Sequence, residues 1–190
     1  MHRSQIVRWT ASLVLLFGAV PGTAYCDCET EVRPSSTPPP GPGTAPWFGG
    51  DGGGLVRLPA SGVRGLYVLG ISGASGTHVD RLGLSTMTST GGAMPAAGEV
   101  GGPGGGAFVE RCDDNFYATG IWGAAGLLVD SIGLICRDLA TAKSRQMTNL
   151  HGGMGGTPFV YECPSGYHLD GLNLRVGTYV DAIQATCAAD

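Results

Sequence analysis

Three aspartates end the same short pattern, GxxxD, and they are the residues of this sequence best suited to chemistry. The pattern reads GTHVD, GLLVD and GTYVD, and it ends at Asp80, Asp130 and Asp181. An ionised carboxylate offers paired acceptors that suit the vicinal hydroxyls of a hexose, and charge-assisted hydrogen bonds are the stronger kind. The alternative is that the aspartates cap strands or accept hydrogen bonds from turn amides.

Three glycine-rich stretches precede these aspartates at similar spacing. They read GGDGGG, GGPGGG and GGMGG, over residues 49–54, 101–106 and 152–156. Glycine lets the main chain approach a sugar ring where any Cβ would collide, although tight turns also favour glycine. A phosphate-binding loop is excluded because no Lys-Ser/Thr pair follows any of the three stretches.

An internal repeat explains the threefold occurrence of both features. Aligned on the aspartates, three segments read GISGASGTHVDRLGL, GIWGAAGLLVDSIGL and GLNLRVGTYVDAIQA. Apolar residues alternate with small residues in these segments, which is typical of strands with one buried face. Repetition on this scale indicates units that share one core, so we expect an all-β fold in which three four-stranded sheets pack as the faces of a triangular prism.

The cysteines follow the same repeat. Cys112 and Cys136 are 24 residues apart in the second unit, and Cys163 and Cys187 are 24 residues apart in the third. The first unit lacks both partners, as a disulfide within each unit predicts. Zinc would prefer closely spaced pairs, so we expect no metal site. Two further cysteines, Cys26 and Cys28, remain unassigned.

The N-terminal region predicts export from the cytoplasm. Residues 1–24 combine basic residues, a short apolar run and small residues before a cleavage site, as a signal peptide does. Cys26 raises a lipoprotein alternative, but Tyr25 is bulky for the position before a lipidated cysteine. We therefore expect a secreted protein, extracellular or periplasmic, and no later segment is apolar enough to span a bilayer.

A tail and one domain should follow the signal peptide. Residues 25–46 form a Cys- and Pro-rich tail whose second half, residues 33–46, holds six prolines and should run extended as a linker. The globular domain is expected at 47–190, with repeats at about 47–98, 99–149 and 150–190.

Composition and motifs exclude several classes of function. Without residues 1–24 the chain has a net charge near −6, because two arginines and no acids are removed from 11 basic and 15 acidic residues. An acidic surface of this kind argues against nucleic acid as a partner. No GxSxG or HExxH motif is present, and no second acid recurs beside the GxxxD patterns, so we expect no enzyme and no cofactor.

The combined pattern resembles that of jacalin-related lectins over roughly residues 47–190. The resemblance rests on three GG loops in phase with three GxxxD patterns. It implies a β-prism I fold of three Greek-key sheets with internal pseudo-threefold symmetry. It also implies metal-independent binding of mannose- or glucose-type glycans and glycoproteins. Homo-oligomerisation stays open.

The resemblance also implies specific contacts to sugar. The three carboxylates would accept hydrogen bonds from sugar hydroxyls, and each would be completed by a glycine of the next unit. Those pairs are Asp80 with Gly105, Asp130 with Gly156, and Asp181 with Gly53. Backbone N–H groups would donate to sugar oxygens at Thr77, His78, Leu127, Leu128, Thr178 and Tyr179.

One position of the pattern differs between the three units. An aromatic ring there would cover the apolar face of the sugar, and the residues are His78, Leu128 and Tyr179. The third site is therefore expected to be the most complete. The disulfides instead resemble those of the vitelline membrane outer layer proteins. That second resemblance implies the alternative function, a structural β-prism of an extracellular matrix or envelope with vestigial sugar sites.

Overall fold

The computed structural model of the chain describes residues 43–60, 63, 65–94 and 98–190. Contacts divide the chain into two compact units, Met1–Thr37 and Pro38–Asp190, and all described residues belong to the second. The predicted signal peptide, Cys26, Cys28 and most of the predicted linker lie outside the described residues. Within the described residues, none forms a helix long and apolar enough to cross a membrane.

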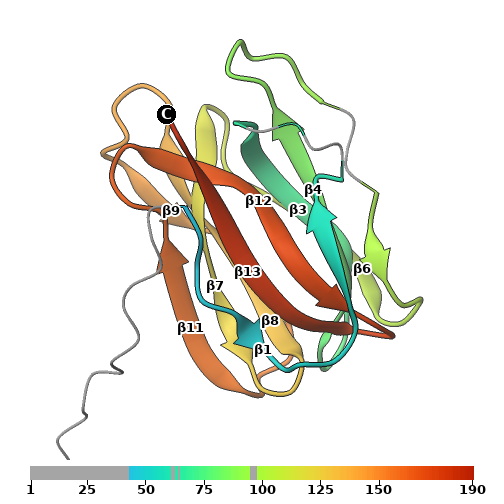
Figure 1. Cartoon of the computed structure of the whole chain (residues 1–190). Helices are drawn as coiled ribbons and strands as arrows, with labels where there is room; N and C mark the ends of the chain where they lie inside the picture. The colour runs from blue at the N-terminus through green and yellow to red at the C-terminus, as the bar shows by residue number, and fades with distance from the viewer. Residues whose placement is uncertain (1–42, 61–62, 64, 95–97) are drawn as a thin grey trace, which may run out of the picture. The chain divides into compact units, whose positions relative to one another are not determined.

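The second unit is built of antiparallel strands in three sheets (Figure 1). The first sheet has the order β5-β4-β3-β6, with β3 Tyr67–Ser75, β4 Val79–Met87, β5 Val100–Gly101 and β6 Gly106–Arg111. The second has the order β10-β8-β7-β11, with β7 Phe116–Ala125, β8 Val129–Asp138, β10 His151–Gly152 and β11 Thr157–Glu162. The third has the order β1-β13-β12-β2, with β1 Phe48–Gly49, β2 Gly54–Leu58, β12 Tyr167–Val176 and β13 Val180–Ala189.

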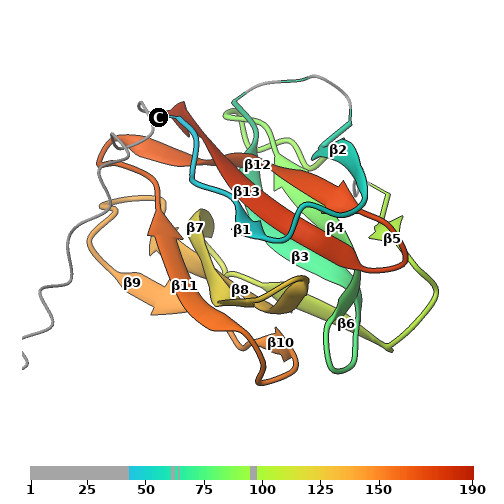
Figure 2. The same ribbon diagram turned by 60° about the horizontal axis from the view of Figure 1, so that its bottom comes forward.

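The three sheets share one Greek-key plan. A long central hairpin carries the GxxxD pattern at its turn, and two outer strands flank a glycine-rich loop. In each sheet the hairpin comes from one repeat and the outer strands come from the next. The third sheet therefore joins strands from the two ends of the domain, as Figures 1 and 2 show where β1 and β2 flank β12 and β13.

The prediction of a three-sheet β-prism is confirmed, with one difference in strand number. The second sheet has a fifth strand, β9 Arg145–Met147, which pairs with β8. The Asp138 carboxylate explains the extra strand, because it accepts backbone hydrogen bonds from Thr141 (2.7 Å) and Ser144 (2.9 Å). This tight turn reverses the chain and lays β9 beside the end of β8.

The core collects the inward side chains of all three hairpins. The alternating apolar positions predicted from the repeat are fully buried, including Leu82, Ile132 and Ile183 at one equivalent position. Equivalent residues on the partner strands, Ile71, Ile121 and Leu172, are also buried. Because side chains alternate between faces along a strand, one hydrophobic core positions all three GxxxD turns.

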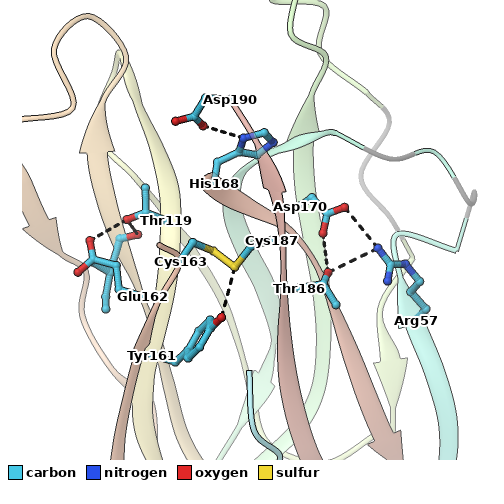
Figure 3. The surroundings of a disulfide bond; sticks show 11 residues. Arg57, Thr119, Tyr161, Glu162, Cys163, His168, Asp170, Thr186, Cys187 and Asp190 are labelled. Carbon is cyan, nitrogen blue, oxygen red and sulfur yellow. Dashed lines mark hydrogen bonds and ion pairs between the residues drawn. A yellow bond between two sulfur atoms is a disulfide. The ribbon is translucent and has the colours of Figure 1, made fainter. Parts of the chain in front are cut away.

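Covalent bonds hold two of the three contacts between neighbouring sheets. Cys112, which follows β6, bonds to Cys136 on β8, and Cys163, which follows β11, bonds to Cys187 on β13. The expected pairing is therefore present, and each bridge joins two adjacent sheets. Figure 3 shows the second bridge, with the Tyr161 hydroxyl 3.7 Å from the Cys187 sulfur.

Aromatic stacks reinforce all three contacts between sheets. Phe48 stacks on Phe159 with ring centroids 4.3 Å apart, and His151 stacks on Phe108 at the same distance. Between the third and first sheets, Tyr67 stacks on His168 with ring centroids 3.8 Å apart. An apolar cavity of about 450 Å³ lies between the same two sheets, with Val56 and Val100 in its lining. This cavity differs in kind from the polar site described next, because its walls are mostly hydrocarbon.

Candidate functional site

The three GxxxD turns place their aspartates in the same way. Asp80, Asp130 and Asp181 are each the second residue of a strand, on β4, β8 and β13 respectively. The N–H of the pattern glycine donates to the carbonyl two residues later, at 2.9 Å in all three turns. Each carboxylate therefore leaves its hairpin at an equivalent point.

A glycine loop lies against each aspartate and is anchored to its main chain. The N–H groups of Gly50, Gly102 and Gly153 donate to the backbone carbonyls of Asp181, Asp80 and Asp130 at 3.0, 2.9 and 2.8 Å. The loop comes from the following repeat, or from the first repeat in the case of Asp181. The structure thus brings together the pairs that the lectin resemblance implied.

The carboxylates lie so close to these loops that only glycine fits. A Cβ on Gly53 would lie 2.6 Å from Oδ2 of Asp181, and one on Gly105 would lie 2.5 Å from Oδ2 of Asp80. Gly156 has the same relation to Asp130. These three glycines also have φ of 69°, 72° and 71°, a region that side chains disfavour. Both the contact and the turn therefore require glycine here.

A second glycine in each loop, which the residue pattern did not predict as a contact, faces the other carboxylate oxygen. Added Cβ atoms on Gly52, Gly104 and Gly155 would collide with Oδ1 of Asp181, Asp80 and Asp130. The sequence did hold a signal for this contact, because each loop contains two adjacent glycines: Gly52-Gly53, Gly104-Gly105 and Gly155-Gly156. Each carboxylate is consequently held in a cradle of main chain, which we call a carboxylate cradle.

The cradles differ in how much of the aspartate they expose. Asp80 and Asp130 are 6% and 7% exposed, whereas Asp181 is half-buried. Among the described residues, the buried Oδ2 of Asp181 has no hydrogen-bond partner. A buried carboxylate oxygen without a donor costs free energy. The protein therefore leaves acceptor capacity at Asp181 unused by its own groups.

Exposed turn residues surround the cradles. Thr77, Thr178 and Leu127 are exposed, Leu127 to 86%, and Tyr179 is 38% exposed. His78 and Leu128 are half-buried. The turns therefore offer backbone N–H groups and an aromatic ring at the surface, beside two buried carboxylates and the half-buried carboxylate of Asp181.

Arginines hold two of the glycine loops in place. The Arg81 guanidinium lies 3.5 Å from the carbonyl of Gly104, and the Arg175 guanidinium lies 3.3 Å from the carbonyl of Asp51. Arg81 also pairs with Glu99 at 2.8 Å, and Arg175 lies over the ring of Trp47 at 5.4 Å. These contacts hold the two loops beside their hairpins.

Two further observations bear on binding, one on Trp122 and one on metal ions. Trp122 on β7 is half-buried, and its indole Nε1 lies 2.5 Å from the position of a Cβ on Gly133. The ring thus packs on its own sheet. Over residues 43–60, 63, 65–94 and 98–190, no three His, Cys, Asp or Glu side chains cluster so as to hold a metal ion.

The fold is similar to that of solved jacalin-related lectins. Malaysian banana lectin has 18% identity and a TM-score of 0.61, covering 77% of this chain and 98% of its own. Calystegia sepium agglutinin has 22% identity and a TM-score of 0.59 over 77% and 96% of the two chains. A mannose-binding jacalin-related lectin from Ananas comosus has 24% identity and a TM-score of 0.57 over 77% and 97%. Calsepa lectin has also been solved with a biantennary N-glycan.

Sequence comparisons add nothing to this likeness. No family model matches the chain, and no curated protein matches it significantly. The structural likeness therefore establishes the β-prism fold of these lectins, while the function has to be argued from the carboxylate cradles.

Proposed function

We propose that this chain is a secreted lectin that binds mannose- or glucose-type glycans through its three carboxylate cradles, without a metal. The observation that carries the proposal is the threefold cradle itself. Three carboxylates are held by paired glycines at the same point of three sheets, and at Asp181 one buried oxygen has no partner within the described residues. A cradle used only for folding would be expected to satisfy that oxygen.

The chemistry of the cradles suits a neutral hexose. Vicinal hydroxyls donate to a carboxylate and accept from main-chain N–H groups at the same time, which a cradle beside an exposed turn allows. Glycine admits the ring, and Tyr179 adds aromatic surface. The mannose-binding lectin from Ananas comosus and the N-glycan complex of Calsepa lectin, which share the fold, support this class of ligand.

We propose no enzymatic activity for these sites. Hydrolysis of a glycosidic bond needs two carboxylates that converge on one bond. Each cradle is built around one aspartate, so it offers binding without the acid and base pair. Secretion rests on the signal-peptide pattern at residues 1–24, and two disulfides agree with an oxidising compartment.

Binding to a glycan array and calorimetry with methyl α-D-mannoside test the proposal. We expect binding by the wild-type chain and loss of binding by Asp80→Asn/Asp130→Asn/Asp181→Asn. Asp114→Asn is a control for the loss of a single carboxylate, because it makes the same Asp→Asn change at an exposed position before β7, at the other end of that strand from the cradle. Binding should also survive a chelator, and a loss that Ca²⁺ restores would contradict a metal-free site.

A structural role in a matrix or envelope is the second candidate. The observation that favours it is the pair of disulfides that join adjacent sheets, since such bridges stabilise a small extracellular domain by about 3 kcal/mol each. A chain that binds no glycan on the array, yet loses stability when either bridge is removed, would favour this role over the lectin.

A further inference from the structure

We propose that Glu110 and His151 form a positioning pair for one of the three cradles, the one around Asp130. The pair fixes the start of the glycine loop that closes this cradle, residues 152–156, against the neighbouring first sheet. Its effect on sugar affinity rests on the proposed lectin function, whereas its effect on the loop does not. The Asp130 site thus depends on a polar contact between sheets, in place of the apolar contacts found at the other two loops.

A short, largely buried contact joins the two side chains across the boundary between sheets. His151 on β10 belongs to the second sheet, and its Nε2 lies 2.7 Å from Oε2 of Glu110 on β6 of the first sheet. The two side chains are 23% and 15% exposed, so water competes little for the contact. The imidazole also stacks on Phe108 of β6, with ring centroids 4.3 Å apart. Two residues of β6 therefore hold one ring.

The pair lies directly beside the loop that closes the cradle. β10 is only two residues long, His151–Gly152, and it pairs with β8 next to Asp130. The following N–H, of Gly153, donates to the Asp130 carbonyl at 2.8 Å. Four of the five loop residues are glycines, and the fifth, Met154, is fully exposed. The loop therefore has no side chain of its own for packing, and His151, directly before it, supplies the anchor.

Arginine side chains hold the other two loops. The Arg81 guanidinium contacts the carbonyl of Gly104, and the Arg175 guanidinium contacts that of Asp51. Among the residues that the structure describes, no side chain donates a hydrogen bond to a carbonyl of residues 152–156. The positioning pair is therefore the polar anchor of the Asp130 loop.

The equivalent contacts at the other two loops are apolar or aromatic. The residue before the first loop glycine is Phe48 or Val100 in those units. Phe48 stacks on Phe159 with ring centroids 4.3 Å apart, and Val100 lines the apolar cavity. Beside the Phe48 stack, Tyr161 takes the register position of Glu110 on its own strand. The β-prism therefore does not require a polar pair at this place, and the contact between the third and second sheets provides an aromatic replacement that fits the fold.

Amide hydrogen exchange of the loop tests the positioning role without sugar. Glu110→Ala should lower the exchange protection of the Gly153 amide about tenfold, because the segment before it loses its anchor. Gly50 and Gly102, whose N–H groups donate at the other two cradles, should change by less than about twofold. Glu110→Gln, which is closer in shape, gives the same measurement if the alanine variant folds poorly. Unchanged protection at Gly153 in a folded variant would overturn the positioning role.

Single-site proteins test the consequence for binding. Asp80→Asn/Asp181→Asn retains the Asp130 site, and Asp80→Asn/Asp130→Asn retains the Asp181 site. In calorimetry with methyl α-D-mannoside, Glu110→Ala should weaken the first protein about three- to tenfold, as a loop closed in about a third to a tenth of the molecules would do. The second protein should change by less than about twofold. Equal losses at the two sites, or no loss at the Asp130 site, would contradict a pair that positions one loop.

A rescue variant separates positioning from any direct role of the Glu110 charge. Glu110→Tyr/His151→Phe copies the contact of Phe48 with Phe159 and Tyr161, and both Glu110 and Tyr161 stand two residues before a bridged cysteine. Affinity at the Asp130 site should return to within about twofold of the parent protein. A double variant that melts like its parent and still binds weakly would overturn the positioning role.

Failure of the proposed function can be told apart from failure of the positioning pair. Absence of sugar binding by the parent single-site proteins would overturn the lectin function. The exchange protection of Gly153 in Glu110→Ala would then still decide whether the pair positions the loop.

Discussion

Replacing Asp181 by asparagine separates a sugar-binding role from a structural one. The substitution keeps the shape of the side chain and turns one acceptor oxygen into a donor. In a protein that retains only this site, we expect the affinity for methyl α-D-mannoside to fall at least tenfold. Hydrogen bonds to a charged group contribute about 1.5–3 kcal/mol each, and a tenfold change in affinity corresponds to about 1.4 kcal/mol.

The thermal stability of the Asp181→Asn variant should rise slightly or stay unchanged, although its affinity for sugar falls. Oδ2 of Asp181 is buried and unpartnered among the described residues, and such an oxygen costs about 1–3 kcal/mol in the folded state. Removing the charge relieves part of that cost. A change of 1 kcal/mol shifts Tm by about 2–4 °C for a domain of this size, so we expect Tm to stay constant or rise by a few degrees.

Calorimetric titration and thermal unfolding of the same preparations provide the assay. The background is Asp80→Asn/Asp130→Asn, to which Asp181→Asn is added, with Asp114→Asn as the control for charge. A variant that melts several degrees lower and binds sugar as well as its parent would refute the reasoning, because Asp181 would then be a strand cap.

Three further predictions concern the cradle, the bridges and acid stability. Gly105→Ala should abolish binding at the Asp80 site by calorimetry, because its Cβ would lie 2.5 Å from the Asp80 carboxylate at a φ of 72°; retained affinity would mean that the cradle is not the site. Replacing Cys163 and Cys187 together by serine should lower the free energy of unfolding by about 3 kcal/mol in denaturant titrations, since the bridge closes a loop of 24 residues; an unchanged midpoint would show that the bridge does not constrain the chain. Burial raises the pKa of Glu162, but hydrogen bonds from arginine and threonine side chains outweigh it and hold that pKa below its ordinary 4.5. The ionised carboxylate therefore stabilises the folded state above pH 4.5, and this stabilisation is lost as the pH falls through the lowered pKa. The Tm difference between wild type and Glu162→Gln should therefore be largest at neutral pH and shrink as the solution is acidified. A Tm difference that does not depend on pH would contradict the ion pairs at Glu162.

The sequence by itself determined the class of fold and the repeating parts of the candidate site. Alternation of apolar residues reports a strand with one buried face, and this local rule located the hairpins that carry Asp80, Asp130 and Asp181. The pairing of Cys112 with Cys136 followed from the repeat as well, since both members of a pair occur in two units and neither occurs in the first. A pattern that occurs in several repeats of one chain can be recognised from the sequence without knowing how the repeats pack together.

The residue pattern alone did not determine which copies meet; the lectin resemblance implied the pairs, and the tertiary structure brings them together. The periodicity of a strand says nothing about its partners, because pairing between distant strands depends on how the whole chain closes. The structure joins the hairpin of the third repeat to strands of the first, so that Gly53 lies at Asp181 although the two residues are far apart in the sequence. For the same reason a one-dimensional alignment groups His78 with Asp80, whereas packing between sheets sets its ring 3.6 Å from Asp130.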